Sequence, residues 1–219
     1  MSAILTSDQE RLLSTLAKET QITDRFYLSG GIALAEYYLH HRLSEDLDFF
    51  SEDEIDVEGL SALIKKIGAK IGITETTFEQ SYNRNLFFLR MHDSTVKTEF
   101  TYYPFARIEK GMQEGDLSID SLLDIAVNKI FTISQKPRSR DFIDLYCILQ
   151  QQPEWTIDEI VLKAQAKFDH HIDPLQLSAQ CLKAQELTDY PTMKIPLAEK
   201  VWQDFFVAES KRLAQSQLR

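Results

Sequence analysis

Cysteine, glycine and proline are scarce in this chain of 219 residues, which contains 2, 7 and 6 of them respectively. Cys147 and Cys181 stand far apart in the sequence and lack the paired spacing of a zinc site. We therefore expect two incidental thiols in a protein of a reduced compartment. Hydrophobic residues make up 43% and charged residues 26% of the chain, a composition that excludes a disordered or fibrous protein.

Long apolar runs are missing as well. No uncharged stretch approaches the ~20 residues that a helix needs to cross a bilayer, and the start has no basic region followed by an apolar run. The sequence therefore predicts a cytoplasmic protein without a membrane partner. Positive charge is also in deficit, because the formal net charge is -10. This deficit disfavours broad non-specific binding to nucleic acid but does not exclude a local basic groove.

The order of the segments predicts an α+β protein, with a mixed sheet flanked by helices in residues 1–106 and a mainly helical bundle in residues 107–219. Ser7–Glu10 predicts a capping box at the start of the first helix, and residues 107–116 are the expected linker. Strands are predicted at 26–28, 46–50, 73–78, 85–92 and 95–103, with Asp93-Ser94 as a tight turn, and further helices at 32–41, 56–71, 118–134, 139–150, 156–168, 174–187 and 196–217.

Two carboxylates, Asp46 and Asp48, alternate with apolar residues in one predicted strand. Because successive side chains of a strand point to opposite faces, both carboxylates project together while Leu47 and Phe49 enter the core. Such a pair needs a positive partner, and Mg²⁺ takes hard oxygen ligands while accepting triphosphate oxygens in its remaining positions. The alternative is a solvated strand end beside an acidic loop.

A glycine pair precedes these acids. Ser29-Gly30-Gly31 lies between a predicted strand and a predicted helix. Glycine lets the backbone approach a phosphate closely, and free N–H groups at the start of the helix, together with the Ser29 hydroxyl, would face the phosphates of a nucleotide. The alternative is a Gly-Gly turn with a purely structural role.

A third acid, Glu99, is the only acidic side chain in the predicted strand 95–103. If this strand lies beside the Asp46 strand, Glu99 completes a set of three carboxylates for two Mg²⁺ ions, an arrangement used for in-line transfer. Cross-strand pairing of Glu99 with Arg90 or Lys97 is the structural alternative.

The helical half contributes Lys129, which lies in an otherwise apolar stretch and would extend its charge towards a triphosphate, unless it is a surface lysine. Arg140, Asp141 and Asp144 follow on the next predicted helix, where the two aspartates share a face. An exposed Arg140–Asp144 pair would be worth only ~0.3 to 0.5 kcal/mol, so stability gives little reason for it. These residues therefore favour a role in catalysis or in binding a nucleotide.

Two blocks of the sequence resemble a known family, the AbiEii/AbiGii-type toxin nucleotidyltransferases of the polymerase-β-like superfamily. Ser29–Leu34 is similar to the family's opening Gly-Gly turn. His41–Phe49 is similar to its Arg-x-Ser-x-Asp-x-Asp segment, in which Arg42 and Ser44 would brace the loop. The two blocks are specific when they occur together.

Later blocks are similar too. Val96–Phe100 resembles the family's strand with the third acid, although many members carry Asp where this chain has Glu. Lys129 resembles the helical lysine, and Arg140–Leu145 resembles the final Arg-Asp-x-x-Asp-Leu element. The resemblance spans residues 26–149, whereas residues 150–219 match no motif of the family.

The residues and the resemblance together predict an Mg²⁺-dependent enzyme that moves a nucleoside monophosphate from a triphosphate to a hydroxyl of RNA, such as transfer RNA, of protein or of a small molecule. The resemblance implies a toxin of a toxin–antitoxin or phage-defence pair, with a cognate antitoxin as partner. Two alternatives fit the same residues, a non-catalytic nucleotide- or partner-binding module and a phosphotransferase (kinase). The expected catalytic residues are Asp46, Asp48, Glu99, Lys129 and Asp144, the first three as metal ligands, and the expected nucleotide-binding residues are Ser29, Gly30, Gly31, Arg42, Ser44, Lys129, Arg140 and Asp141.

Overall fold

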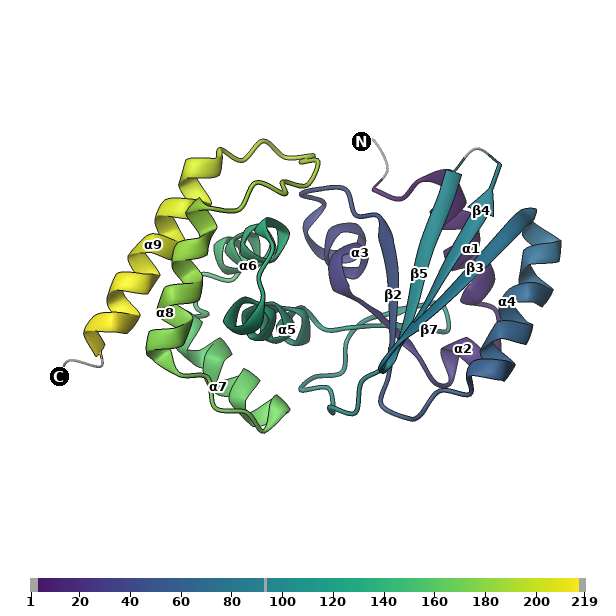
Figure 1. Ribbon diagram of the computed structural model, residues 1–219, viewed down its shortest axis with the longest axis horizontal. Coiled ribbons are helices and arrows are strands. Elements are labelled where there is room, and N and C mark those ends of the chain that lie inside the picture. The colour runs from purple at the N-terminus through teal and green to yellow at the C-terminus, as the bar shows by residue number, and fades with distance from the viewer. Residues whose placement is uncertain (1–3, 93, 217–219) are drawn as a thin grey trace. The chain divides into compact units, whose positions relative to one another are not determined.

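The computed structural model describes residues 4–92 and 94–216, and the chain divides into two compact units (Figure 1). The sheet unit comprises Met1–Tyr38, Leu43–Ala106 and Lys110–Ser121, and the helical unit comprises Leu39–Arg42, Arg107–Glu109 and Leu122–Arg219. The units do not meet at a single boundary after residue 106. Residues 39–42 belong to the helical unit, and residues 110–121 belong to the sheet unit. Helices in one part and a mixed sheet in the other confirm the expected α+β class.

The described part of the sheet unit contains a seven-stranded sheet with the order β3-β4-β5-β2-β1-β7-β6. β2 pairs in parallel with β5, and β1 in parallel with β7, whereas the other neighbours are antiparallel. The three strands β3, β4 and β5 therefore form an antiparallel extension at one edge of the sheet. The bounds are β1 Tyr27–Ser29, β2 Asp46–Ser51, β3 Ile73–Ser81, β4 Arg84–Met91, β5 Ser94–Tyr102, β6 Gln113–Glu114 and β7 Leu117–Ile119.

Alternation along β2 fixes which residues enter the core. Leu47 and Phe49 are fully buried, and the ring of Phe49 stacks on that of Phe100 at a centroid distance of 5.0 Å. Helices α1 (Ser7–Leu16) and α4 (Val57–Ile71) lie together on one side of this sheet (Figure 1). The alternation expected from the sequence is confirmed, since Asp46 and Asp48 are half-buried on the opposite face.

Helix ends follow ordinary capping chemistry. The capping box of α1 uses Thr6 and Gln9, one residue earlier than predicted, because the Thr6 hydroxyl accepts the Gln9 backbone N–H. Asp56 caps α4 in the same way, and Gly72 ends it with a positive φ of 80°. Helix α3 (Gly30–Leu34) begins at the glycine pair and continues into a π-helical turn, Ala35–Leu39. The expected turn at residue 93 lies outside the described residues.

The described part of the helical unit contains helices that pack around buried aromatic residues. Phe142 packs against Trp202 and Phe206, with ring centroids 6.2 and 4.8 Å away.

The helix predicted from residue 118 was wrong at its start, because Leu117–Ile119 forms β7, whose two apolar residues are buried beside β1. The bounds are α5 Leu122–Gln135, α6 Ser139–Gln151, α7 Ile157–Phe168, α8 Pro174–Leu182 and α9 Glu199–Ser216.

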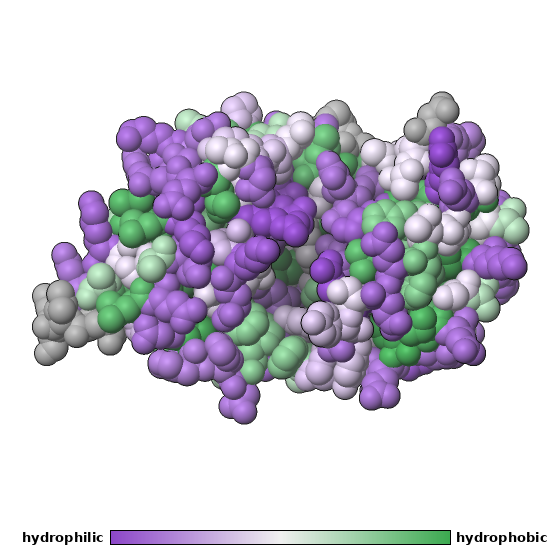
Figure 2. Space-filling model, viewed as in Figure 1, coloured by the Kyte–Doolittle hydropathy of each residue, from purple (hydrophilic) through white to green (hydrophobic). Residues whose placement is uncertain are grey.

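The face shown in Figure 2 carries mostly hydrophilic residues, between which hydrophobic residues gather in separate patches. Among the described residues, no helix combines the length and the apolar character that spanning a membrane requires.

Candidate active site

The predicted carboxylates lie on one face of two neighbouring strands. In the parallel β2–β5 register, Asp46 is opposite Lys97 and Asp48 is opposite Glu99. Residues paired in register point to the same side of a sheet, so the three acids share a face. The Lys97 ammonium nitrogen lies 2.9 Å from an Asp46 carboxylate oxygen. The structure therefore brings together the three acids that are far apart in the sequence.

Glu99 is held by the guanidinium group of Arg84, which donates two hydrogen bonds to its carboxylate. Its two carboxylate oxygens accept hydrogen bonds from Arg84 Nε at 2.6 Å and Arg84 Nη2 at 2.5 Å, and the Thr101 hydroxyl donates at 2.6 Å. Glu99 is buried, and burial alone would raise its pKa, but the bonds from Arg84 and Thr101 outweigh burial and lower it. The structural partner of Glu99 is thus Arg84, and not Arg90, which lies near Glu75.

A double-mutant cycle checks the Arg84–Glu99 pair. With Arg84→Ala, Glu99→Gln and the double variant, we expect a coupling free energy of about 1 to 2 kcal/mol, because a charged hydrogen-bonded pair is strong but Arg84 is half-exposed. The control is the Arg90–Glu75 pair, whose atoms are 3.7 Å apart on exposed side chains, and there we expect less than about 0.5 kcal/mol. Urea unfolding of the variants measures both values. Equal coupling in the two pairs would contradict the assignment.

The glycine turn lies directly against Asp48. Ser29 is opposite Asp48 in the β1–β2 register, and Gly30 follows with a φ of 71°. A Cβ atom at Gly30 would collide with a carboxylate oxygen of Asp48, so only glycine fits both the backbone conformation and the space. The Ser29 hydroxyl is buried and donates to Asp120 Oδ2 at 2.7 Å. Its hydrogen atom is therefore committed to Asp120, and the backbone of Gly30 and Gly31 is the part of the turn nearest Asp48.

The donor set fits a hard cation by its chemistry. Carboxylate oxygens from Asp46, Asp48 and Glu99 on one sheet face are the ligands that Mg²⁺ prefers. In residues 4–92 and 94–216, however, no three His, Cys, Asp or Glu side chains are arranged to hold a metal ion. Lys97 contacts Asp46 and Arg84 contacts Glu99 instead. Binding of a cation by all three acids would require these two contacts to be exchanged.

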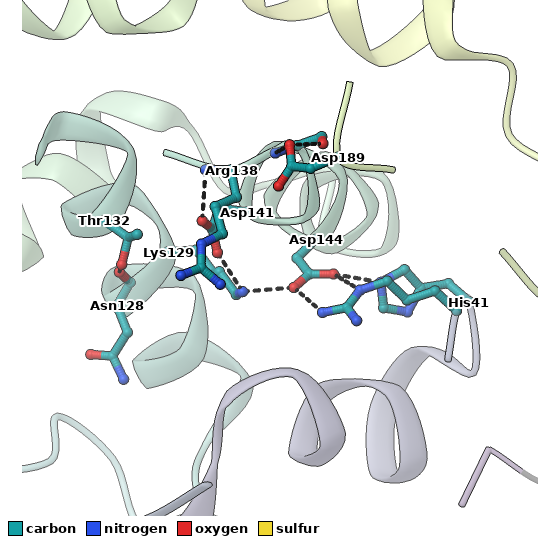
Figure 3. A network of polar contacts seen from close by, with 10 residues as sticks. His41, Asn128, Lys129, Thr132, Arg138, Asp141, Asp144 and Asp189 are labelled. Carbon is teal, nitrogen blue, oxygen red and sulfur yellow. Dashed lines mark hydrogen bonds and ion pairs between the residues drawn. The ribbon is translucent and has the colours of Figure 1, made fainter. Parts of the chain in front are cut away.

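A second group of predicted residues forms a buried ionic network in the helical unit (Figure 3). Asp144 on α6 is fully buried. Its Oδ1 atom accepts a hydrogen bond from Arg42 Nε at 2.6 Å and lies 2.8 Å from His41 Nε2. Its Oδ2 accepts from Arg42 Nη2 at 2.7 Å and lies 2.8 Å from Lys129 Nζ. Burial would raise the pKa of Asp144, but the charges of Arg42 and Lys129 hold it well below its ordinary value.

Lys129 points between two carboxylates, those of Asp141 and Asp144, as Figure 3 shows. Its ammonium is 2.8 Å from Asp141 Oδ1, and only 9% of the residue is exposed. Burial would lower the pKa of Lys129, but the two aspartates raise it. Lys129 is therefore not a surface lysine. In the part of the chain that the structure describes, Asp144 contacts His41, Arg42 and Lys129, which lie on other segments than Arg140.

Sequence reasoning missed three residues that the geometry brings to these groups. His41 joins the Asp144 network, Arg84 binds Glu99, and Asp120 binds Ser29. His41 and Arg84 carried a weak signal, since His41 directly precedes Arg42 and Arg84 lies close to a second basic residue, Arg90, in the sequence. Asp120 carried none, because it is distant from Ser29 in the sequence. Ser44 contributes through its backbone, whose carbonyl accepts from Gln9 Nε2 at 3.1 Å.

Comparison with protein-family models gives a match to the nucleotidyl transferase AbiEii toxin, type IV toxin–antitoxin system, over residues 11–217. The chain belongs to the AbiEii family. An uncharacterised protein of Aquifex aeolicus (strain VF5) is 30% identical to this AbiEii-family chain over 151 residues, which are 67% of the chain and 68% of that protein. The family assignment identifies the chain as a nucleotidyltransferase and confirms the resemblance drawn from its motifs.

Solved structures share the fold of the AbiEii-family chain. The crystal structure of JHP933 from Helicobacter pylori covers 97% of the chain and 94% of its own length, with a TM-score of 0.59 and 17% identity. The Megavirus polyadenylate synthase covers 70% of the chain and 34% of its own length, with a TM-score of 0.47 and 16% identity. The first likeness extends over both units, whereas the second is too distant to add to the family assignment.

Proposed function

We propose that this nucleotidyltransferase moves a nucleoside monophosphate from a nucleoside triphosphate to an acceptor hydroxyl and releases pyrophosphate. The observation that supports the proposal is the in-register pairing of Asp48 with Glu99, beside Asp46 and against the Gly30 turn. A purely binding module has no need for three acids on one face next to a glycine turn. The acids and the turn together suit a polyanionic substrate with a divalent cation.

In this proposal Asp46, Asp48 and Glu99 hold Mg²⁺, with two ions as the expected number. The chemistry that Mg²⁺ supplies when bound is activation of the attacking hydroxyl and neutralisation of charge on the departing pyrophosphate. Gly30 and Gly31 place their backbone close to the phosphates. Glu99 completes this metal site or accepts the proton of the acceptor hydroxyl.

The helical network has a different proposed role. Asp144 and Asp141 fix the positions of Lys129 and Arg42, so that the positive charges of this unit are held rigidly. Rigid charges are more effective towards a polyanion than mobile ones, because they need no reorganisation during the reaction. Within this proposal Lys129 and Arg140 take part in nucleotide binding, as the resemblance to the family implies, and Arg42 braces the segment that leads to Asp46.

The family description places its members in type IV toxin–antitoxin systems. We propose accordingly that this chain acts as a toxin in the cytoplasm, that a cognate antitoxin opposes it, and that the acceptor is RNA or protein. The net charge of -10 makes extended contact with RNA unfavourable, so an RNA acceptor would be bound over a short region.

Two radioactive labels distinguish the possible reactions. The protein is incubated with Mg²⁺, total RNA and cell protein, and with each of the four ribonucleoside triphosphates labelled at the α or the γ phosphorus. Nucleotidyl transfer puts only the α label on the acceptor and releases pyrophosphate, and this is the result that we expect. Transfer of the γ label alone would show a kinase. Transfer of neither label with any triphosphate would favour a binding module, and chelation of Mg²⁺ with EDTA is the control.

A further inference from the structure

Asp120 is a fully buried acid that links both sides of the glycine turn. It lies in the sheet unit directly after β7. Its carboxyl oxygen Oδ2 accepts from the Ser29 hydroxyl at 2.7 Å, and its backbone N–H donates to the Leu28 carbonyl at 2.8 Å. Its backbone carbonyl accepts from the Tyr38 hydroxyl at 2.8 Å. One residue thus contacts the strand that enters the turn and the helical segment that leaves it.

A buried carboxyl group that connects a strand and a helix has an unfavourable desolvation free energy. Removing a polar or charged group from water costs free energy that its hydrogen bonds recover only in part, and apolar packing often stabilises as well. What a carboxyl group adds is direction, because it fixes the Ser29 hydroxyl, and with it the backbone that turns at Gly30. The position of that backbone matters, because Gly30 is in contact with the carboxylate of Asp48.

We propose that Asp120 is a positioning residue for Asp48. Asp120 holds Ser29 on one side, Ser29 and Gly30 lie against Asp48 on the other, and the distance between the turn and the carboxylate is set by this chain of contacts. The inference rests on the proposed function of Asp48. A shift of about 1 Å at a reacting group can reduce catalysis about a hundredfold, so even a small relaxation of the turn matters.

The test compares Asp120→Ala, Asp120→Asn and Asp124→Asn. Asparagine at 120 keeps an oxygen that accepts from Ser29, whereas alanine does not. Asp124 is the matched control, since it is also a fully buried acid but binds Lys167 in the helical unit. Each variant is assayed for α-label transfer well below its own melting temperature, so that loss of folded protein does not enter kcat. Hydrogen exchange of the peptide that spans residues 27–36 is measured on the same samples.

We expect Asp120→Ala to lower kcat about 10- to 100-fold with a smaller change in KM, and to accelerate exchange at the turn. Asp120→Asn should restore kcat to within a few-fold of the wild type, and Asp124→Asn should leave the turn unchanged. Unaltered exchange and unaltered kcat in Asp120→Ala would overturn the inference, as would equal losses in both Asp120 variants. If the wild type transfers no label, the proposed function fails, while the exchange result still decides whether Asp120 holds the turn.

Discussion

Replacing Asp48 with asparagine is expected to reduce nucleotidyl transfer on the order of a thousandfold, because a bound metal ion supplies several kcal/mol of transition-state stabilisation and one carboxylate fewer weakens its site. Asparagine keeps the size of the side chain and one oxygen, so the contact with the Gly30 turn is preserved. The loss should therefore fall on kcat, and the melting temperature should change little. Transfer of the α label, followed over time, measures the effect.

The matched control for Asp48→Asn is Glu54→Gln. Glu54 is an exposed acid of the same acidic segment, and it lies outside β2. Its replacement removes one negative charge as Asp48→Asn does, and we expect no more than about a twofold change, since exposed charges are screened by solvent and salt. Wild-type activity in Asp48→Asn would remove the catalytic role of the sheet face. Equal losses in both variants would point to the overall charge instead.

Replacing Asp144 with asparagine should have the largest effect on stability. The change leaves Arg42 and Lys129 buried with only Asp141 to balance them, and breaking a buried ion pair costs about 3 to 5 kcal/mol. For a chain of this size that corresponds to a fall in melting temperature of about 10 °C. Urea unfolding and calorimetry give both quantities. Gln150→Ala, an exposed change on the same helix, should leave them almost unchanged.

The stability difference between the wild type and Asp144→Asn should depend on pH in a defined way. The pKa of Asp144 is lowered by folding, so its charge stabilises the native state at every pH above the unfolded pKa, about 4. The stabilisation is lost only as the pH falls from there through the lower folded pKa. The stability difference between wild type and Asp144→Asn should therefore be constant from about pH 5 to 8 and shrink below about pH 4. A difference that disappears near neutral pH would contradict the ionic network.

Local patterns predicted the sheet face well. Alternation along β2 places Asp46 and Asp48 together, and this depends only on neighbouring residues. The short strand β7 was mistaken for the start of a helix, because its partner β1 is about ninety residues away in the chain and its own three residues carry little periodicity. The pairing of strands so far apart in the chain cannot be predicted from the residues of either strand alone.

The partners of the acids were harder to predict than the acids themselves. Arg84 reaches Glu99 because the β4–β5 register places Arg84 opposite Thr101, two residues from Glu99 on the same face. A one-residue shift of that register would have turned Arg84 to the other side. Asp144 was considered with Arg140 by helical spacing, but its partners come from Arg42 and Lys129, which lie on other segments. The positions of charged residues were thus predictable, and the way in which they pair was not.

The interleaving of the two units along the chain has a consequence for synthesis on the ribosome. Arg42 emerges about a hundred residues before Asp144, and the sheet unit lacks β6, β7 and Asp120 until residues 110–121 have been made. The amino-terminal half of the nascent polypeptide therefore has neither its last strands nor the counter-charge for Arg42. We expect transfer activity to arise only after translation of α6, because Arg42 lacks its counter-charge until Asp144 has been made.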